Sequence, residues 1–273
     1  MDLCDIRGVV SDMDGVLWRG DVPLPGLVPF FSLLRERELP WVLATNNSSK
    51  SRQDYVRKLA AMGVPDVPTR NIVTSGTATA AWLRRRYEAG TRLHVFGGDG
   101  LRDELRNAGF CVADSDVVVV VAGLNRNFNY QDLQLASDLI RNGACFVGTN
   151  PDTTFPAANG VAPGAGSLLA ALAAASGVEP RIIGKPHPPM FEAALELLGT
   201  DASQTLMIGD RMNTDILGAA RVGMRTALIM TGIASHNDLD NSAPGPDMIC
   251  ESLPALITTL APGWMNSSTR PAS

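Results

Sequence analysis

Two aspartates, in the sequence Asp12-Met13-Asp14-Gly15, come directly after a short run of apolar β-branched residues. A carboxylate can attack phosphorus as a covalent nucleophile, and a second carboxylate two residues later can protonate the leaving oxygen and then activate water. The same D-x-D-G pattern also occurs as an Asx turn that is closed by glycine. Asp12 and Asp14 are therefore candidates for phosphoryl chemistry, and a purely structural turn is the alternative.

A polar segment, Thr45-Asn46-Asn47-Ser48, closes the next β-rich run and opens a helical pattern. A hydroxyl, side-chain amides and backbone N–H groups at the start of a helix form an anion site. Ordinary helix capping by Ser48 or Ser49 would use the same residue types. The segment is a candidate phosphate cradle, and the two roles do not exclude each other.

Two later strand ends also carry charged residues. Lys185 follows the run 181–184 and precedes Pro186. Its ammonium group could neutralise charge on a transferred phosphoryl group, although most lysines are solvated surface charges. Asp210 and Asp215 follow another apolar run. They offer carboxylate oxygens to a hard cation, and Mg²⁺ prefers a few such ligands together with water and substrate phosphate.

These four segments must be positioned by the elements that precede them. Short β-rich runs alternate with helical patterns along most of the chain, which indicates βαβ units and a parallel sheet. In an open parallel sheet, ligands bind at the carboxyl ends of the strands. Each of the four segments follows a predicted strand; the strands are 8–11, 41–44, 181–184 and 206–208. The same patterns predict a strand at 72–74 and helices at 130–141 and 214–222. Four such segments at one edge are a stronger indication of phosphoryl transfer than any one of them.

The composition excludes several other classes of protein. The 273 residues are 45% hydrophobic and carry a formal net charge of −5, which is typical of a soluble globular protein and gives no basic surface for nucleic acid. Four cysteines lie far apart without a CxxC pair, which favours idle thiols in a reducing compartment. The N-terminus has acids where a signal peptide needs basic residues, and no apolar run is long enough to span a membrane. We therefore expect a cytoplasmic protein.

The motifs D-x-D-G-V-L, T-N-N-S, G-K-P and G-D-R-x-x-T-D occur in the order of the four signatures of the haloacid dehalogenase-like hydrolases. The chain resembles in particular the capped branch that contains NagD and the p-nitrophenyl phosphatases, from Val9 to about Gly232. This resemblance implies a Rossmann-like, doubly wound α/β core with an inserted α/β cap. The core would comprise residues 1–90 and 181–261, and the cap residues 91–180. Residues 262–273 are rich in Ser and Pro, which predicts a disordered tail.

The resemblance also implies a role for each candidate residue. Asp12 is similar to the nucleophile, which is also a metal ligand, and Asp14 is similar to the general acid and base, whose backbone carbonyl binds Mg²⁺. A dehalogenase lacks the second acid, so Asp14 argues for phosphate chemistry. The other implied roles are phosphate binding by Thr45, Asn46, Asn47 and Lys185, direct metal binding by Asp210, and outer-shell orientation of metal-bound water by Asp215.

In this branch the segment 148–156 resembles the substrate-facing loop of the cap. Asp152 and Phe155 are its candidate substrate contacts, and a simple turn that contains proline and aspartate is the alternative. Phe155 stands where pyridoxal-phosphate phosphatases tend to carry a histidine, which argues against a vitamin B6 substrate. Arg19 and Arg211 flank two of the motifs and could either contact an anionic substrate or form ion pairs.

The sequence thus predicts a magnesium-dependent phosphatase that acts on small phosphate monoesters through an aspartyl-phosphate on Asp12. Candidate substrates are phosphoglycolate, glycerol phosphate, nucleoside monophosphates, sugar phosphates and p-nitrophenyl phosphate. One alternative is a phosphomutase or phosphotransferase that uses the same intermediate, and another is a catalytically idle binding protein. The expected partner is a small phosphorylated metabolite. The sequence leaves the oligomeric state open, and similar proteins include homodimers formed through the cap.

Overall fold

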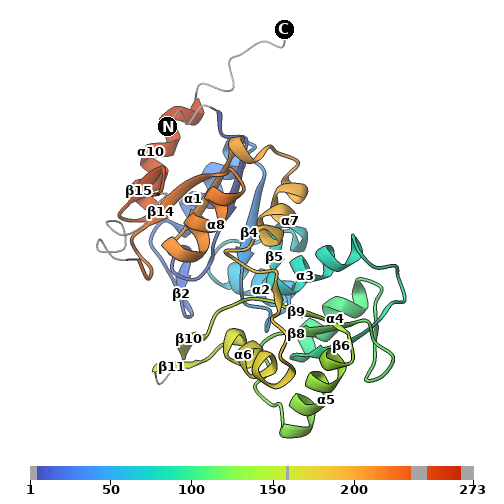
Figure 1. Cartoon of the computed structure of the whole chain (residues 1–273). Helices are drawn as coiled ribbons and strands as arrows, with labels where there is room; N and C mark the ends of the chain where they lie inside the picture. The colour runs from blue at the N-terminus through green and yellow to red at the C-terminus, as the bar shows by residue number, and fades with distance from the viewer. Residues whose placement is uncertain (1–4, 158–159, 235–244, 266–273) are drawn as a thin grey trace. The chain divides into compact units, whose positions relative to one another are not determined.

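The computed structural model describes residues 5–157, 160–234 and 245–265, and the chain divides into two compact units (Figure 1). The first unit comprises residues 1–44, 53–72 and 194–273, and the second comprises residues 45–52 and 73–193. The block expected to form the cap, 91–180, lies within the second unit. That unit also takes in 45–52, 73–90 and 181–193, so the expected boundaries between core and cap stay a prediction.

A six-stranded sheet contains the strands that precede the first, second and fourth motifs. The expectation of four motifs at one sheet edge is wrong for the third, because the strand before Lys185 spans only Arg181–Ile182 and pairs in the five-stranded sheet of the second unit. The six-stranded sheet has the order β15-β14-β13-β1-β4-β5. The pairs β1–β13, β1–β4, β13–β14 and β14–β15 are parallel, so the carboxyl ends of these strands meet at one edge. The strands are β1 (Gly8–Ser11), β4 (Trp41–Thr45), β5 (Ile72–Thr74), β13 (Thr205–Gly209), β14 (Arg225–Ile229) and β15 (Met248–Cys250).

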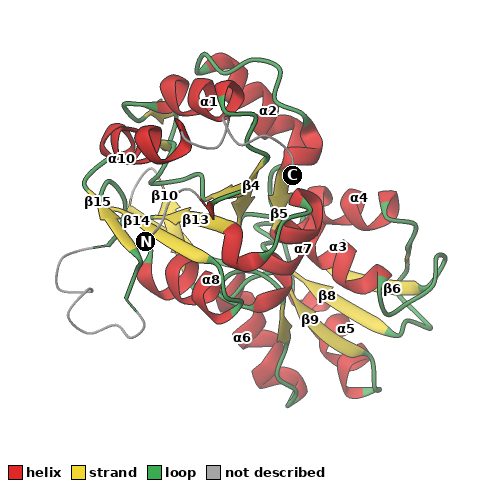
Figure 2. Cartoon of the chain, turned by 90° about the horizontal axis from the view of Figure 1, so that it is seen from above, coloured by secondary structure: helices red, strands yellow, loops and turns green. Residues whose placement is uncertain are grey.

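Helices cover both faces of this sheet (Figure 2). On one face, α1 (Leu27–Glu36), α2 (Arg52–Ala61) and α10 (Leu253–Met265) pack against alternate strand residues such as Ala227 and Ile229. Leu228 lies between those two residues and therefore points to the other face. There it packs against η4 (Met212–Ile216), a single π-helical turn that leads into α8 (Leu217–Arg221). The expected doubly wound α/β fold is confirmed.

The second unit has a parallel sheet of its own, in the order β12-β9-β8-β6-β7. Its core is formed by Phe96, Val120 and Phe146 from the strands with apolar residues of α5 and α6. The strands are β6 (Arg92–Phe96), β7 (Cys111–Val112), β8 (Val119–Ala122), β9 (Cys145–Gly148) and β12 (Arg181–Ile182). The helices are α3 (Ser75–Arg84), α4 (Asp99–Asn107), α5 (Tyr130–Arg141), α6 (Ala165–Ser176) and α7 (Pro188–Leu198), which continues into the first unit.

Two antiparallel hairpins and two 3₁₀ turns complete the described elements. The hairpins are β2 (Trp18–Arg19) with β3 (Val22–Pro23), and β10 (Thr154–Ala157) with β11 (Gly160–Pro163). The 3₁₀ turns are η2 (Thr69–Asn71) and η3 (Ala202–Gln204). Helix α10 ends at Met265, so residues 262–265 of the expected disordered tail are helical, and residues 266–273 lie outside the described part of the chain. None of the described helices has the length and apolarity needed to cross a bilayer.

Candidate active site

In the first unit, Asp12 and Asp210 follow neighbouring strands and are both buried. The Asp12 N–H donates to the carbonyl of Ile208 at 2.8 Å, which fixes the end of β1 against β13. Gly15 has a φ of +91°, and a Cβ added there would lie 2.3 Å from Oδ2 of Asp210. Gly232 is closer still, since a Cβ added there would lie 1.8 Å from the same oxygen. The two glycines let the backbone close tightly around the Asp210 carboxylate.

Backbone N–H groups orient the two acids of the fourth motif. Oδ2 of Asp210 accepts a hydrogen bond from the Ile233 N–H at 2.9 Å. Oδ2 of Asp215 accepts one from the Arg211 N–H at 3.2 Å. Asp215 lies in the π turn η4, and such turns are frequent at functional sites because they re-aim a side chain within a helical segment. The sequence pattern predicted an ordinary helix starting at 214, so this turn is a finding of the structure.

Asp12, Asp210 and Asp215 each offer a carboxylate oxygen, and these three oxygens all lie within 4.8 Å of one another. All three residues are buried. Three carboxylates at this spacing repel one another, and burial strengthens the repulsion, so a divalent cation fits among them electrostatically. An all-oxygen donor set suits Mg²⁺ and contains no thiolate or imidazole that would favour zinc. The residues therefore fit the magnesium ion that the sequence predicted.

Asp14 has a different environment, because its side chain is exposed. Its Oδ1 accepts a hydrogen bond from Nε1 of Trp18 at 2.9 Å. The Trp18 ring is fully buried, lies nearly parallel to the Tyr55 ring at 6.4 Å, and has the ammonium of Lys58 at 4.6 Å from its centroid. The indole therefore holds the Asp14 carboxyl in one orientation. Sequence reasoning did not identify Trp18, although a buried indole N–H that needs an acceptor was a usable signal.

In the second unit, the side chain of Asn46 connects two other chain segments. Its Oδ1 accepts a hydrogen bond from the Lys185 N–H at 2.8 Å, and its Nδ2 donates to the Lys185 carbonyl at 3.0 Å. Nδ2 also lies 3.2 Å from both carboxylate oxygens of Asp152. The backbone carbonyl of Asn46 accepts hydrogen bonds from Nδ2 of Asn150 at 2.7 Å and from Oγ of Ser75 at 2.6 Å. The Asn46 side chain thus positions Lys185 and Asp152.

Thr45 and Asn47, the neighbours of Asn46, accept hydrogen bonds within the same turn. Oγ1 of Thr45 accepts from the Asn47 N–H at 3.2 Å, and the Thr45 hydroxyl keeps its own hydrogen for another acceptor. Oδ1 of Asn47 accepts from the N–H and the hydroxyl of Ser49, at 2.9 and 2.7 Å. Capping by Ser48 or Ser49 was one alternative from the sequence. The structure instead makes Asn47 the acceptor in this turn, and α2 begins only at Arg52.

The end of this segment is held by an ion pair between Arg52 and Glu104 of α4, with Nη2 and Oε1 3.2 Å apart. Burial raises the pKa of the Glu104 carboxyl, and the Arg52 guanidinium opposes that shift. Residues 45–52 are thus held to the rest of the second unit at both ends, through Asn46 and through Arg52.

Phe155 and Arg19 are two further candidates from the sequence. Phe155 is in β10, and the guanidinium of Arg126 lies 4.8 Å from the centroid of its ring. Arg19 donates through Nη2 to the carbonyl of Thr231, whose own hydroxyl donates to the Gly15 carbonyl at 2.7 Å. Arg19 therefore braces the loop around Asp210, and it forms no ion pair with another described residue.

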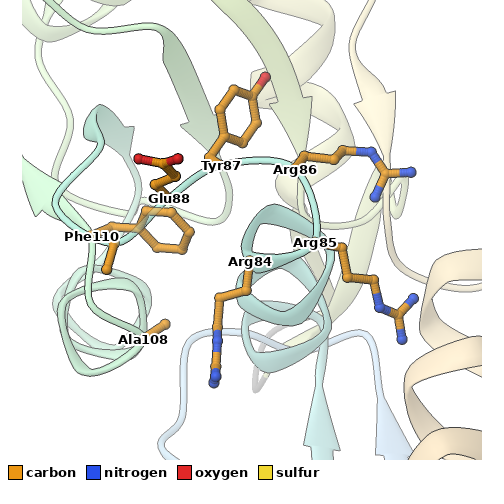
Figure 3. Close-up of a pocket in the computed structure, with 8 residues that line it drawn as sticks. Arg84, Arg85, Arg86, Tyr87, Glu88, Ala108 and Phe110 are labelled. Carbon is orange, nitrogen blue, oxygen red and sulfur yellow. The ribbon is translucent and has the colours of Figure 1, made fainter.

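A pocket of about 480 Å³ between the end of α3 and residues 108–110 contains none of the predicted site residues (Figure 3). Arg84, Arg85 and Arg86 line it. Arg85 pairs with Glu192 at 3.7 Å, and Arg86 stacks on the ring of Trp82. At least two of the three arginines thus already have partners within the protein. Because none of the predicted site residues lines this pocket, we do not assign the active site to it.

Replacing Asn46 with aspartate should lower both stability and activity. The variant keeps the shape of the side chain but turns the Nδ2 donor into an oxygen that faces the Asp152 carboxylate and the Lys185 carbonyl. Leaving buried polar groups unsatisfied costs about 1–3 kcal/mol, and like-charge repulsion adds to this cost. Urea unfolding at pH 7 measures the loss. The same change at the exposed Asn107 serves as the control, and equal midpoints for the two variants would contradict the assigned role.

Comparisons with known proteins agree with these motifs. Residues 9–111 match the family described as haloacid dehalogenase-like hydrolase, and residues 182–256 match the family described as HAD-hydrolase-like. The dihydroxyacetone phosphatase of Corynebacterium glutamicum (strain R) is 36% identical over 255 residues, which cover 93% of this chain and 90% of that protein.

Solved structures with the same fold are similar over almost the whole chain. NagD from E. coli K-12 has a TM-score of 0.85 and 36% identity, covering 91% of this chain and 97% of that one. Glycerol phosphate phosphatase Rv1692 from Mycobacterium tuberculosis, solved in complex with magnesium, has a TM-score of 0.86 and 31% identity, covering 94% of this chain and 78% of that one. Together with the two family matches, these similarities show that the chain belongs to the haloacid dehalogenase-like hydrolases, in the NagD-like branch.

Proposed function

We propose that this protein is a magnesium-dependent phosphatase that hydrolyses small phosphate monoesters through an aspartyl-phosphate on Asp12. The observation that carries the proposal is the group of three buried carboxylates, Asp12, Asp210 and Asp215, whose oxygens lie within 4.8 Å of one another after the ends of neighbouring parallel strands. The names of the two relatives, a dihydroxyacetone phosphatase and a glycerol phosphate phosphatase, support a small phosphorylated metabolite as substrate.

In the first half-reaction, a carboxylate oxygen of Asp12 attacks phosphorus while the bond from phosphorus to the leaving oxygen breaks. The protonated carboxyl of Asp14 gives its proton to that leaving oxygen. In the second half-reaction, the Asp14 carboxylate takes a proton from water as the water oxygen attacks phosphorus. The bond between Asp12 and phosphorus then breaks, inorganic phosphate leaves, and both residues return to their starting states.

The residues proposed to bind the phosphoryl oxygens are Thr45, Asn46 and Lys185. The Thr45 hydroxyl and the backbone N–H of Asn46 are suitable donors, since the Asn46 side chain is engaged with Lys185 and Asp152 and the Asn47 N–H donates to Thr45. The Lys185 ammonium would neutralise charge that develops on the phosphoryl group. Because the Asn46 side chain is already used, we assign it to positioning and leave direct phosphate contact to its backbone.

Removing divalent metal should abolish activity. A bound Mg²⁺ would offset the repulsion between the Asp12 carboxylate and the phosphate oxygens. Dialysis against excess chelator should reduce phosphate release to background, Mg²⁺ should restore it, and Mn²⁺ or Co²⁺ should restore part of it. Mg²⁺ should also raise the melting temperature of the wild type, because a ligand that binds only the folded state stabilises it, and Asp210→Asn should reduce that shift. Full activity in excess chelator would contradict the proposal.

A panel of phosphate monoesters tests the reaction itself. Phosphate release should be observed with several small esters and should equal the amount of ester consumed. Loss of ester without release of inorganic phosphate, in the presence of a sugar acceptor, would indicate a phosphotransferase instead. Assembly as a homodimer is a further prediction, and size-exclusion chromatography with light scattering would test it.

A further inference from the structure

A buried serine of the second unit contacts the loop that is proposed to bind phosphate. Ser75 is the first residue of α3 and is fully buried. Its Oγ donates a hydrogen bond to the backbone carbonyl of Asn46 at 2.6 Å, although the two residues are 29 positions apart in the sequence. The reaction proposed above gives this hydroxyl no role.

Capping of α3 does not account for the position of the Ser75 hydroxyl. Thr74 is the N-cap of this helix, and its Oγ1 accepts a hydrogen bond from the Thr77 N–H at 3.1 Å. Oγ1 of Thr77 accepts in return from the Thr74 N–H at 2.9 Å. These reciprocal bonds form a capping box that satisfies the start of the helix. The Ser75 hydroxyl therefore serves the neighbouring loop and not its own helix.

The Asn46 carbonyl accepts a second hydrogen bond, from Nδ2 of Asn150 at 2.7 Å. Asn46, Ser75 and Asn150 are all buried, and all three belong to the second unit. A carbonyl oxygen has two lone pairs, so the two donors use its full acceptor capacity. They thereby fix the orientation of the peptide plane between Asn46 and Asn47.

The N–H of the same peptide contacts the Thr45 hydroxyl. A trans peptide is planar, so its C=O and N–H groups point in opposite directions. The Asn47 N–H donates to Oγ1 of Thr45 at 3.2 Å. Because this bond uses a lone pair of the hydroxyl oxygen, the O–H hydrogen points elsewhere and is available to a ligand. The Ser75 hydroxyl, the peptide and the Thr45 hydroxyl thus form a chain in which every group donates to the next, and hydrogen bonds in such chains strengthen one another.

We propose that Ser75 is a positioning residue for phosphate binding, because its hydroxyl orients the 46–47 peptide and that peptide orients the Thr45 hydroxyl. This inference rests on the proposed phosphatase function, in which Thr45 donates to a phosphoryl oxygen. Ser75 acts through Thr45 and does not itself contact the phosphate. The phosphoryl group is common to all phosphate monoesters, so the contribution of Ser75 should not depend on the leaving group.

A double-mutant cycle between Ser75 and Thr45 tests this inference. The measurements are kcat/KM for p-nitrophenyl phosphate and glycerol phosphate, and the affinity for inorganic phosphate by calorimetry. Ser75→Ala should lower kcat/KM for both esters, and the affinity for phosphate, by about threefold to tenfold, the usual effect of one hydrogen bond. In a Thr45→Val background the hydroxyl is absent, so Ser75→Ala should have little further effect, since residues that act through one another are not additive.

Ser137→Ala is the matched control. Ser137 is also a buried serine of the second unit, 2% exposed, and its Oγ donates to the Leu133 carbonyl at 2.7 Å within α5. This variant should leave kcat/KM and the affinity for phosphate unchanged. Should Ser75→Ala fail to fold, Ser75→Cys replaces it in the cycle, because a thiol is only a weak donor.

The outcomes separate this inference from the proposed function. Equal losses from Ser75→Ala with and without the Thr45 hydroxyl, or unchanged affinity for phosphate in a folded Ser75→Ala variant, would overturn the role of Ser75 and leave the phosphatase intact. A wild type that releases no phosphate from any ester, together with a loss of phosphate affinity that depends on the Thr45 hydroxyl, would contradict the phosphatase function and keep the role of Ser75.

Discussion

Replacing Asp12 with asparagine should remove nearly all turnover while the fold is retained. An amide oxygen is a poor nucleophile toward phosphorus, and the amide lacks the charge that would balance a bound cation. No phosphoenzyme should form. Because the change also relieves repulsion from Asp210 and Asp215, which share the 4.8 Å group with Asp12, the metal-free variant should melt at or above the temperature of the metal-free wild type.

The measurements are phosphate release, intact mass after acid quench, and thermal unfolding without metal. Asp66→Asn is a matched control, because Asp66 is exposed and has a φ of +60°, a conformation that asparagine tolerates well. The control should keep full activity. Substantial turnover by Asp12→Asn, or a phosphoryl group mapped to another residue in the wild type, would overturn the assignment of the nucleophile.

Replacing Asp14 with asparagine should slow both half-reactions by about 10²- to 10⁴-fold, the usual effect of general acid and base catalysis. Asparagine keeps an oxygen for the hydrogen bond from Trp18, so the geometry of the turn should survive and the loss should come from proton transfer. With p-nitrophenyl phosphate the leaving group scarcely needs a proton. The first step should then suffer less than hydrolysis of the intermediate, and aspartyl-phosphate should accumulate.

Mass spectrometry of the quenched Asp14→Asn variant should therefore find one added phosphoryl group on the peptide that contains Asp12. Trp18→Phe offers an independent comparison, because it removes the donor to Asp14 and keeps most of the ring. It should lower kcat less than Asp14→Asn does, without the same accumulation. Absence of a phosphopeptide in Asp14→Asn, together with a wild-type rate, would remove Asp14 from proton transfer.

The parts of the fold with strong apolar patterns were predictable. The strands expected at 8–11 and 72–74 match the observed ones, and so does the helix at 130–141. In each case a continuous apolar run or a clear helical period determined the assignment. Helix α4 was missed because its sequence is mostly charged and only Leu101 and Leu105 are buried, which leaves too narrow an apolar stripe.

The site was predictable in its residue types but less so in its contacts. The position of Asp12 after one predicted strand, and of Asp210 and Asp215 after another, was enough to predict an acidic group. Spacing could not reveal that Asn46 bonds the backbone of Lys185, since those residues are 139 positions apart and only tertiary folding brings them together. The sequence pattern also could not predict the π turn at Asp215, because a helix with one inserted residue has nearly the same hydrophobic period as a regular helix.

The hydrogen bonds of Asn46 also determine how this enzyme could be redesigned. Asp152, which accepts a hydrogen bond from the Asn46 side chain, belongs to the loop that leads into the β10–β11 hairpin. Asn150 of the same loop donates a hydrogen bond to the backbone carbonyl of Asn46. A loop exchanged between relatives to alter substrate preference would therefore need to carry both polar residues with it. The smallest transferable block runs from Asn150 to the start of α6, and a shorter graft would disturb the Asn46–Lys185 contact along with substrate choice.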